Sequence, residues 1–233
     1  MVMNIPLVIG RRSSGEEYIT DLTVLQNLFI SYSNDNQLPT IFLQFINQAI
    51  HSNSPIQFSY ALSSRLAQQV KPLVPNQTLF IEFIHADYAE GKINSINEFI
   101  SLLIGEMKNR KALLKKSKTK PSIFPAMFVV IDNIFEVIMS PQKKTSLSFL
   151  ELLITAGRLN MFFIMGSSGI YRNLLNQLIN ISPSLKQKLK TSLHPLGISQ
   201  PLGAELVINP DDLIFFREKN EKEYMRLYPI TAD

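Results

Sequence analysis

Two acidic residues stand in a glycine-framed loop where phosphate chemistry requires a cation and a hydroxyl. Gly10 and Gly15 have the spacing of the glycines in the phosphate-binding motif GxxxxGK[ST], but Glu16 and Glu17 follow them. In that motif a lysine reaches the terminal phosphates and the next hydroxyl binds Mg²⁺. A carboxylate about 4 Å from a phosphate would be repelled by roughly 4 kcal/mol at an effective dielectric of about 20. The candidate loop consists of Gly10, Arg11, Arg12, Ser13, Ser14, Gly15, Glu16 and Glu17.

The same residues also fit an ordinary strand, turn and helix start. Ser14 is a suitable N-cap residue, and Glu16 and Glu17 would complement the positive end of a helix dipole. In either case the strand at residues 5–9 precedes the turn, and a helix is expected to begin near Glu17.

Polar residues also follow two strongly apolar runs further along the chain. Residues 126–131 and 161–165 are continuous apolar runs, which is typical of buried parallel strands. Asp132 and Asn133 follow the first run, and Ser167 follows the second. Ligands of parallel sheets bind beyond the carboxyl ends of the strands, so these residues and the glycine-framed loop are expected to meet at one edge.

The elements that must position these residues alternate between helical and extended patterns. Helices are expected at residues 17–31, 61–70, 95–114, 146–156, 170–181 and 184–191. Strands are expected at residues 5–9, 78–84, 126–131 and 161–165, with a closing hairpin over 213–228; residues 40–45 fit either a strand or a helix start. This alternation predicts an α/β fold whose mostly parallel sheet is covered by helices on both faces, with 5–9, 126–131 and 161–165 central and adjacent.

Composition indicates one globular domain over residues 1–233. The chain is 45% hydrophobic and 18% charged, it contains no cysteine, and its formal charge of +4 is too small to imply a nucleic-acid partner. No apolar run approaches the roughly 18 residues of a membrane span, and the three histidines are too scattered for a metal site. Because the sequence starts almost directly on a strand, we expect a soluble piece of a longer protein.

A basic run ends the helix expected at residues 95–114. It consists of Lys108, Arg110, Lys111, Lys115, Lys116, Lys118 and Lys120. Such a run can contact a phosphate backbone, or it can be a solvated helix end whose cations complement the helix dipole. Because no aromatic residues are interleaved to stack on bases, the solvated end is favoured.

Several sequence pieces together resemble the FtsK/SpoIIIE branch of the RecA-type ATPases. FVVIDN is similar to the Walker B strand, LELLITAGRLNMFFIMGSS to the helix, turn and strand that lead to a polar sensor position, and NEFISLLIGEMKNRKALL to a helix of the type EEMxRRxxLL. Within that branch, the chain resembles the last ATPase-like module of EssC-like membrane coupling proteins of type VII secretion.

The resemblance implies a RecA-like fold with a degenerate nucleotide site. Asp132 matches the acid that holds Mg²⁺ through water, and Ser167 lies near the sensor position. Asn133 stands where many hydrolases have a glutamate that activates water, and an amide cannot take that proton. ATP and Mg²⁺ are the cofactors of the family, but the resemblance implies no cofactor and no catalytic residue in this domain.

The resemblance also implies partners and a location. The chain is expected to be the C-terminal module of a membrane-anchored protein and to lie at the cytoplasmic face of the cell membrane. Its expected partners are small helical secreted substrates, neighbouring ATPase modules of the same chain and, in a hexamer of the full protein, the other subunits, but not nucleic acid. Two alternatives stay open: an active ATPase in which Arg11 or Arg12 supplies the cation, and a DNA translocase motor.

Overall fold

The structure is a computed structural model. It describes residues 4–32, 38–52, 56–62, 66, 68–69, 84–87, 93–117, 124–132, 134, 143–167, 204–208, 213–218 and 221–226. In chain order its elements are β1 (Pro6–Arg11), β2 (Glu17–Asp21), α1 (Leu22–Leu25), β3 (Asn27–Tyr32), α2 (Leu38–Ile50), β4 (Ile56–Leu62), β5 (Ile84–Asp87), α4 (Ile93–Ser117), β6 (Ala126–Ile131), α6 (Lys143–Ala156), the 3₁₀ turn η2 (Gly157–Leu159), β7 (Met161–Ser167), β8 (Ala204–Ile208), β9 (Leu213–Glu218) and β10 (Glu221–Arg226).

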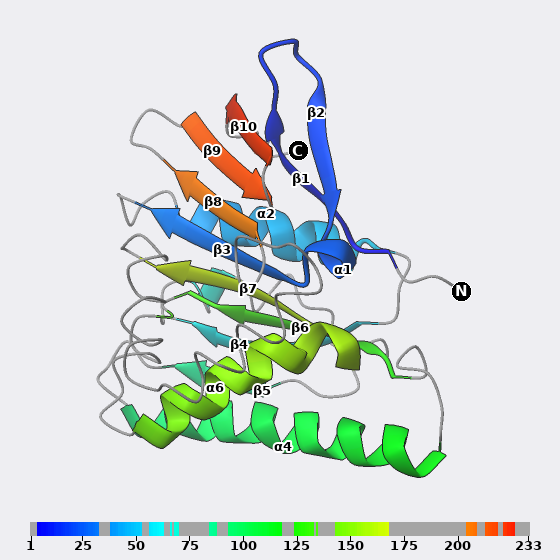
Figure 1. Cartoon of the computed structure of the whole chain (residues 1–233). Coiled ribbons are helices and arrows are strands. Elements are labelled where there is room, and N and C mark those ends of the chain that lie inside the picture. Colours follow the sequence, from blue (N-terminus) through cyan, green and yellow to red (C-terminus); the bar gives the residue numbers. More distant parts are fainter. Residues whose placement is uncertain are drawn as a thin grey trace.

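The strands form one mixed sheet in the order β2-β1-β10-β9-β8-β3-β7-β6-β4-β5. The part from β8 to β5 is parallel throughout, whereas β9, β10, β1 and β2 each run antiparallel to a neighbour. Figure 1 shows the parallel strands stacked with their arrowheads on one side, and the β1–β2 hairpin rising beyond the sheet. The predicted α/β architecture with a mostly parallel sheet is confirmed.

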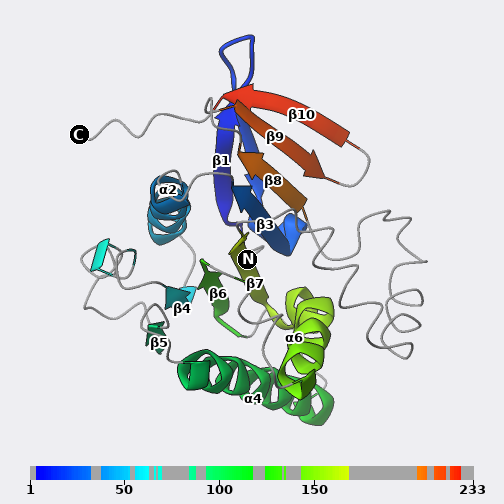
Figure 2. The ribbon, with the colours of Figure 1, turned by 90° about the vertical axis from the view of Figure 1, so that its left-hand side faces the viewer.

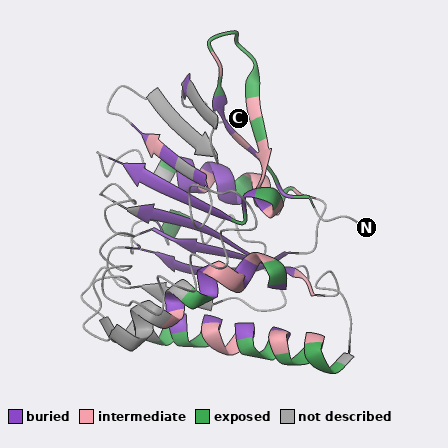
Figure 3. Cartoon of the chain, in the orientation of Figure 1, coloured by how far each residue is buried: buried purple, intermediate pink, exposed green. Residues whose placement is uncertain are grey.

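Helices cover both faces of the parallel part, as predicted. On one face, α2 packs over a core that includes Phe42, Phe45 and Phe128. On the other, α4 and α6 bury Phe99, Phe149 and the alternate residues of β6 and β7. Figure 2 shows these helices on opposite sides of the strands, and Figure 3 shows the buried residues concentrated in the central strands. The runs at 126–131 and 161–165 are apolar throughout because both of their faces are covered.

The helix predicted over residues 17–31 is wrong. Residues 17–21 form β2, which returns from β1 through a turn where Gly15 has φ +90° and the Arg12 amide donates to the Glu16 carbonyl at 2.8 Å. Only residues 22–25 are helical, and β3 follows. The helical spacing misled the interpretation because Leu22 and Leu25 are buried from a single helical turn, while Leu28 is buried from a strand.

The central position predicted for residues 5–9 is also wrong. β6 and β7 are adjacent, with Val129 opposite Phe163, but β1 lies next to the edge strand β2 and β3 occupies the central position instead. Side chains of α2 satisfy the backbone of β1 at Val8. The Val8 amide donates to Gln48 Oε1 at 2.8 Å, and the Val8 carbonyl accepts from Gln44 Nε2 at 3.1 Å.

Several other expectations are confirmed or adjusted. The helix expected at 146–156 belongs to α6, β9 and β10 form the expected closing hairpin, and residues 40–45 belong to α2. Helix α4 begins at Ile93, so Ser95 lies inside it rather than at its cap, and residues 61–62 belong to β4 rather than to a helix.

The strand expected at 78–84 reaches the described residues only at Ile84, the first residue of β5. The expected helices at 170–181 and 184–191 lie outside the described residues. Within the described part of the chain, no helix has the length and hydropathy that a bilayer span requires.

Candidate functional site

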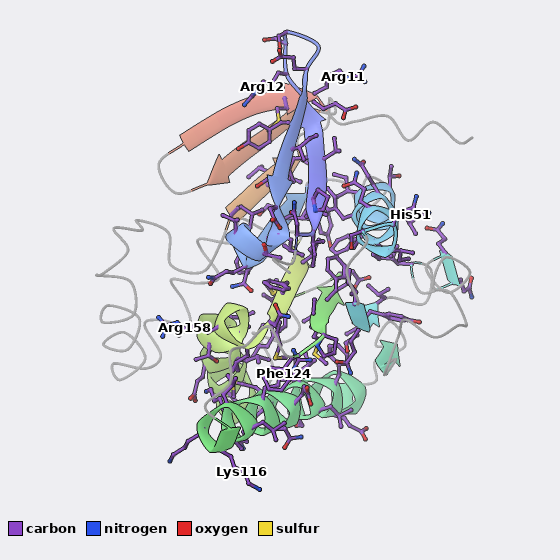
Figure 4. The ribbon with its side chains drawn as sticks, turned by 90° about the vertical axis from the view of Figure 1, so that its right-hand side faces the viewer. Arg11, Arg12, His51, Lys116, Phe124 and Arg158 are labelled. Carbon is purple, nitrogen blue, oxygen red and sulfur yellow. The ribbon has the colours of Figure 1, made fainter. Side chains whose placement is uncertain are left out.

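The glycine-framed loop at residues 10–17 lies at the tip of the β1–β2 hairpin. Its charges are partnered locally: Arg11 lies 3.8 Å from Glu17, and the Arg12 guanidinium lies over the Tyr18 ring at 4.8 Å. Strand β1 runs antiparallel to β10, which has the same direction as β8 and β3. The tip therefore does not lie at the carboxyl edge of the parallel strands, and Figure 4 shows both arginines at its far end. The predicted meeting of this loop with Asp132 is wrong.

The other predicted positions do share that edge. Asp132 directly follows β6, is 4% exposed, and donates its backbone amide to the Ala61 carbonyl at 3.3 Å. Ser167 ends the neighbouring strand β7, and its backbone is in register with Ser31 of β3. Asn133 lies outside the described residues. Strand β7 thus lies between β6, which precedes Asp132, and the central strand β3. Helix α2 follows β3 in the chain.

Among the described strands of the parallel part, β3 is followed in the chain by α2, which is the strand-to-helix order of a phosphate-binding loop, and residues 33–37 between them lie outside the described residues. The motif GxxxxGK[ST] links a strand to a helix whose first turn holds the phosphates. Because β3 ends at Tyr32 and α2 begins at Leu38, the eight motif positions fit residues 33–40 without a gap. Read in this way, Ser33 and Leu38 replace the two glycines, Pro39 replaces the lysine, and Thr40 keeps the hydroxyl.

Residues 33–40 have the length of the motif but lack its glycines and its lysine. The sequence of the connection, SNDNQ, contains neither glycine nor lysine, and Asp35 brings a negative charge. Pro39 has no amide hydrogen, so the first turn of α2 has one donor fewer for an anion. In the sequence, Thr40 and Asp132 are of the residue types that serve Mg²⁺ in intact sites.

Sequence reasoning missed this connection because Gly10 and Gly15 offered a literal motif match. The signal that could have located it was the run Leu28-Phe29-Ile30, followed ten residues later by the apolar face of residues 41–46. A motif that has lost its glycines and lysine is recognisable only by its spacing between a strand and a helix.

One residue of the basic run in α4, Arg110, stabilises the amino edge of the parallel strands, opposite the carboxyl edge that holds Asp132. Arg110 is only 1% exposed, pairs with Glu106 at 2.7 Å and donates to Gln57 Oε1 at 3.1 Å. Its Nη1 donates to the carbonyls of Pro125, Leu159 and Asn160 at 3.0, 2.9 and 3.2 Å. Arg110 therefore joins the amino ends of β4, β6 and β7, which is a structural role.

The remaining described cations of the run lie on the helix surface. Lys108, Lys115 and Lys116 are exposed, and Lys111 lies 3.9 Å from Glu151 of α6. The prediction that the basic run is a solvated helix end is therefore confirmed for these lysines but is wrong for Arg110. Among the described residues, no group of three or more potential ligands is placed to hold a metal ion.

The AGRLN turn before β7 supports the same amino edge. Asn160 adopts a left-handed conformation with φ 61° and donates its side-chain amide to the Phe124 carbonyl at 2.8 Å. Its own carbonyl accepts the Met127 amide at 2.9 Å, which connects the turn to β6. The motif pieces at 106–110 and 156–160 thus stabilise the fold and do not line the carboxyl edge.

This arrangement of strands, helices and polar edge is the RecA-like P-loop ATPase fold, and known structures share it. The sequence matches no protein-family model, and no similar sequence is found among curated proteins. ATPases 2 and 3 of Thermomonospora curvata EccC, in complex with a signal sequence peptide, match 97% of this chain with 14% identity and a TM-score of 0.65. ATPases 2 and 3 of EssC from Geobacillus thermodenitrificans match all of it with 14% identity and a TM-score of 0.64.

A conjugation coupling protein has the same fold. The pCW3 protein TcpA, with bound ATPγS, matches 98% of the chain with 8% identity and a TM-score of 0.66. The chain spans 41% of the EccC chain and 46% of the EssC chain, so it corresponds to less than half of either. The resemblance to EssC-like modules is thereby confirmed at the level of the fold.

Proposed function

We propose that this chain is a degenerate ATPase-like module of a type VII secretion coupling protein, and that it serves docking rather than ATP hydrolysis. The observation that carries the proposal is the β3–α2 connection, where Ser33, Leu38 and Pro39 occupy the positions of the two glycines and the lysine. Phosphoryl transfer depends on positioning and on neutralising phosphate charge, and these positions supply neither.

The second half of the hydrolytic machinery supports the same proposal. Asn133 follows Asp132 in the sequence where many hydrolases have a glutamate, and its amide cannot accept a proton from water. The fold itself is retained, since both faces of the parallel sheet are packed. A docking module needs a stable fold to present its surfaces, but it does not need residues that bind phosphate.

The partners follow from the neighbours of the fold. One of them, EccC, holds a signal sequence peptide, and the EccC and EssC structures contain more than one ATPase. We therefore assign to this chain small helical secreted substrates, and neighbouring modules of a longer protein at the cytoplasmic face of the membrane. A helical substrate would bind through an apolar face laid in a groove.

One observation favours a second candidate, a module that still binds nucleotide. Thr40 and Asp132 retain the hydroxyl and the carboxylate that hold Mg²⁺ in intact sites. Arg11 and Arg12 no longer qualify as the missing cation, because both lie at the hairpin tip. A cation would therefore have to come from another chain or module.

Calorimetric titration with Mg·ATP tests the proposal against this second candidate. We expect no binding in the micromolar range and no phosphate release above that of the Asp132→Ala variant. A micromolar Kd that Asp132→Ala abolishes would establish the second candidate and overturn the proposal. A conjugation-type coupling protein with intact motifs serves as the positive control for the assay.

A further inference from the structure

Two exposed apolar side chains flank the residue that anchors the beginning of the described chain. Ile19 on β2 is 57% exposed and Val24 on α1 is 60% exposed, the two largest values among the exposed large hydrophobic residues that the structure describes. Asp21 lies between them in the sequence and caps α1 by accepting the Thr23 amide at 2.8 Å. Isolated exposed apolar residues are common, so their surroundings decide whether they matter.

The start of the chain is fixed directly beside them. The Ile5 amide donates to Asp21 Oδ1 at 3.1 Å, and the Ile5 carbonyl accepts the Leu22 amide at 3.0 Å. The described part of the chain therefore begins next to β2 and α1.

The hairpin beside this point has the composition of a small interface. Strand β2 is the last strand in the sheet order, so among the described strands it pairs on one side only. Its outward residues alternate with Tyr18, which packs against the core, and the directly opposed residue Val8 on β1 is half-buried. The Arg11–Glu17 ion pair at 3.8 Å adds a polar margin towards the tip. An apolar centre with a polar rim is the usual organisation of a docking surface.

We infer that Ile19 and Val24 form the docking surface for the ATPase-like module that precedes this one in the same chain. The inference rests on the proposed function, which makes this chain one module of a longer protein. We assign this surface to the preceding module because that module would be joined to the beginning of this chain. The covalent connection would hold it at high effective concentration beside Ile19 and Val24. The corresponding EccC and EssC structures are more than twice as long as this chain and contain two ATPases.

Substitution to aspartate tests the surface, with a matched control on α4. Leu102 and Leu113 are 49% and 51% exposed and belong to α4, which packs on β5 and α6 and not on the hairpin. Binding of the preceding module, supplied as a separate fragment, is measured against the wild-type chain, Ile19→Asp/Val24→Asp and Leu102→Asp/Leu113→Asp. We expect the hairpin variant to lose at least about tenfold in affinity, since a charge replaces buried apolar area. The α4 variant should stay within about twofold.

Hydrogen exchange in the intact longer protein provides a second measurement that does not depend on a fragment folding alone. Amides of residues 17–25 should exchange at least about tenfold more slowly there than in the 233-residue chain. Equal exchange in both, or a greater loss of binding in the α4 variant, would overturn the inference and leave the proposed docking function standing. Dimerisation of the isolated chain that Ile19→Asp abolishes would instead assign the surface to a second copy and overturn the occupant. A micromolar Kd for Mg·ATP would instead contradict the proposed function, and it is measured independently of these binding and exchange experiments.

Discussion

The backbone of Gly157 lies against the side chain of Gln26, so that a methyl group at position 157 would come within 2.6 Å of Gln26 Cδ. Gln26 has φ 65° and ends α1 by donating its amide to the Leu22 carbonyl at 2.8 Å. Its own carbonyl accepts the Phe163 amide at 3.2 Å. The turn before β3 and the turn before β7 are therefore packed directly together at the amino edge of the sheet.

Gly157→Ala should destabilise the protein by about 0.5–1.5 kcal/mol, because the exposed Gln26 side chain must move away at a modest packing cost. In a Gln26→Ala background the same change should become neutral or stabilising by about 0.4–1 kcal/mol, since alanine reduces the entropy of the unfolded chain. Urea unfolding of the four proteins gives the coupling energy. Equal effects of Gly157→Ala in both backgrounds would contradict the close packing.

Loss of the Arg110 side chain should be severe. Arg110→Ala removes the hydrogen bonds that the guanidinium donates to three backbone carbonyls and to Gln57, and its ion pair with Glu106. We expect a loss of about 3–5 kcal/mol in the free energy of unfolding, comparable to breaking a buried pair. Arg110→Lys should recover little, because one ammonium group cannot reach all of these acceptors.

The exposed residue Lys115 provides the control for Arg110. Lys115→Ala should change stability by less than about 0.5 kcal/mol. Thermal unfolding measures the difference in stability between the Arg110 variants and Lys115→Ala. Arg110→Lys is included because it is expected to fold more readily than Arg110→Ala. A similar melting temperature for Arg110→Lys and Lys115→Ala would show that the buried hydrogen bonds contribute little.

The sequence predicted the fold where local pattern and tertiary environment agree. Residues 126–131 and 161–165 are apolar on both faces because helices cover both faces, so their strands could be placed from composition alone. The helix predicted over residues 17–31 failed because Leu22, Leu25 and Leu28 are spaced for one helix but are buried from two successive elements, α1 and β3. The turn at Gly15 precedes that segment, the Asp21 cap and the positive φ of Gln26 divide it, and periodicity reports none of these features.

The candidate site was predicted in part for a related reason. Asp132 was placed at the carboxyl edge of the sheet because a carboxylate after a buried strand is a strong local signal. The β3–α2 connection was not considered because it contains neither glycine nor lysine. Its position depends on β3 being central, and that follows from long-range pairing with β7 and β8.

Gln48 should protect a single amide of the β1–β2 hairpin. Its Oε1 accepts the Val8 amide at 2.8 Å. Gln48→Ala should cost about 1–2 kcal/mol and accelerate hydrogen exchange at Val8 by at least about tenfold. Asn47→Ala, at the exposed neighbouring position, is the control. Unchanged exchange at Val8 would show that the glutamine does not hold the strand.

Tyr60 should make the protein sensitive to alkaline pH. Burial in β4 raises the pKa of the Tyr60 phenol from 10.0 to about 12. Since the unfolded chain ionises first, the stabilisation is complete below about pH 10 and is lost as the pH rises towards 12. Between pH 9 and 11, wild type should lose about 1.4 kcal/mol more than Tyr60→Phe. Equal losses in the two proteins, measured by urea unfolding at both pH values, would show that this phenol does not titrate with a raised pKa.

Restoring phosphate-binding residues should reveal which loop descends from the nucleotide site. The variant Ser33→Gly/Leu38→Gly/Pro39→Lys returns the glycines and the lysine to the connection between β3 and α2. We expect its affinity for Mg·ATP to rise at least about tenfold, because a lysine and a freed amide then face the phosphates. The gain should require Asp132, and hydrolysis should not follow, since Asn133 still supplies no base.

The matched control places the same chemistry in the other loop. Glu16→Lys/Glu17→Thr completes the literal motif that begins at Gly10, but these residues form the tip of a hairpin rather than the start of a helix. A hairpin tip lacks the aligned free amides of a helix N-terminus, so lysine there gains no converging donors for the phosphates. This variant should therefore bind Mg·ATP no better than wild type in calorimetric titration. A gain in this variant that exceeds the gain of the β3–α2 variant would return the nucleotide site to residues 10–17 and overturn the assignment of the site to β3 and α2.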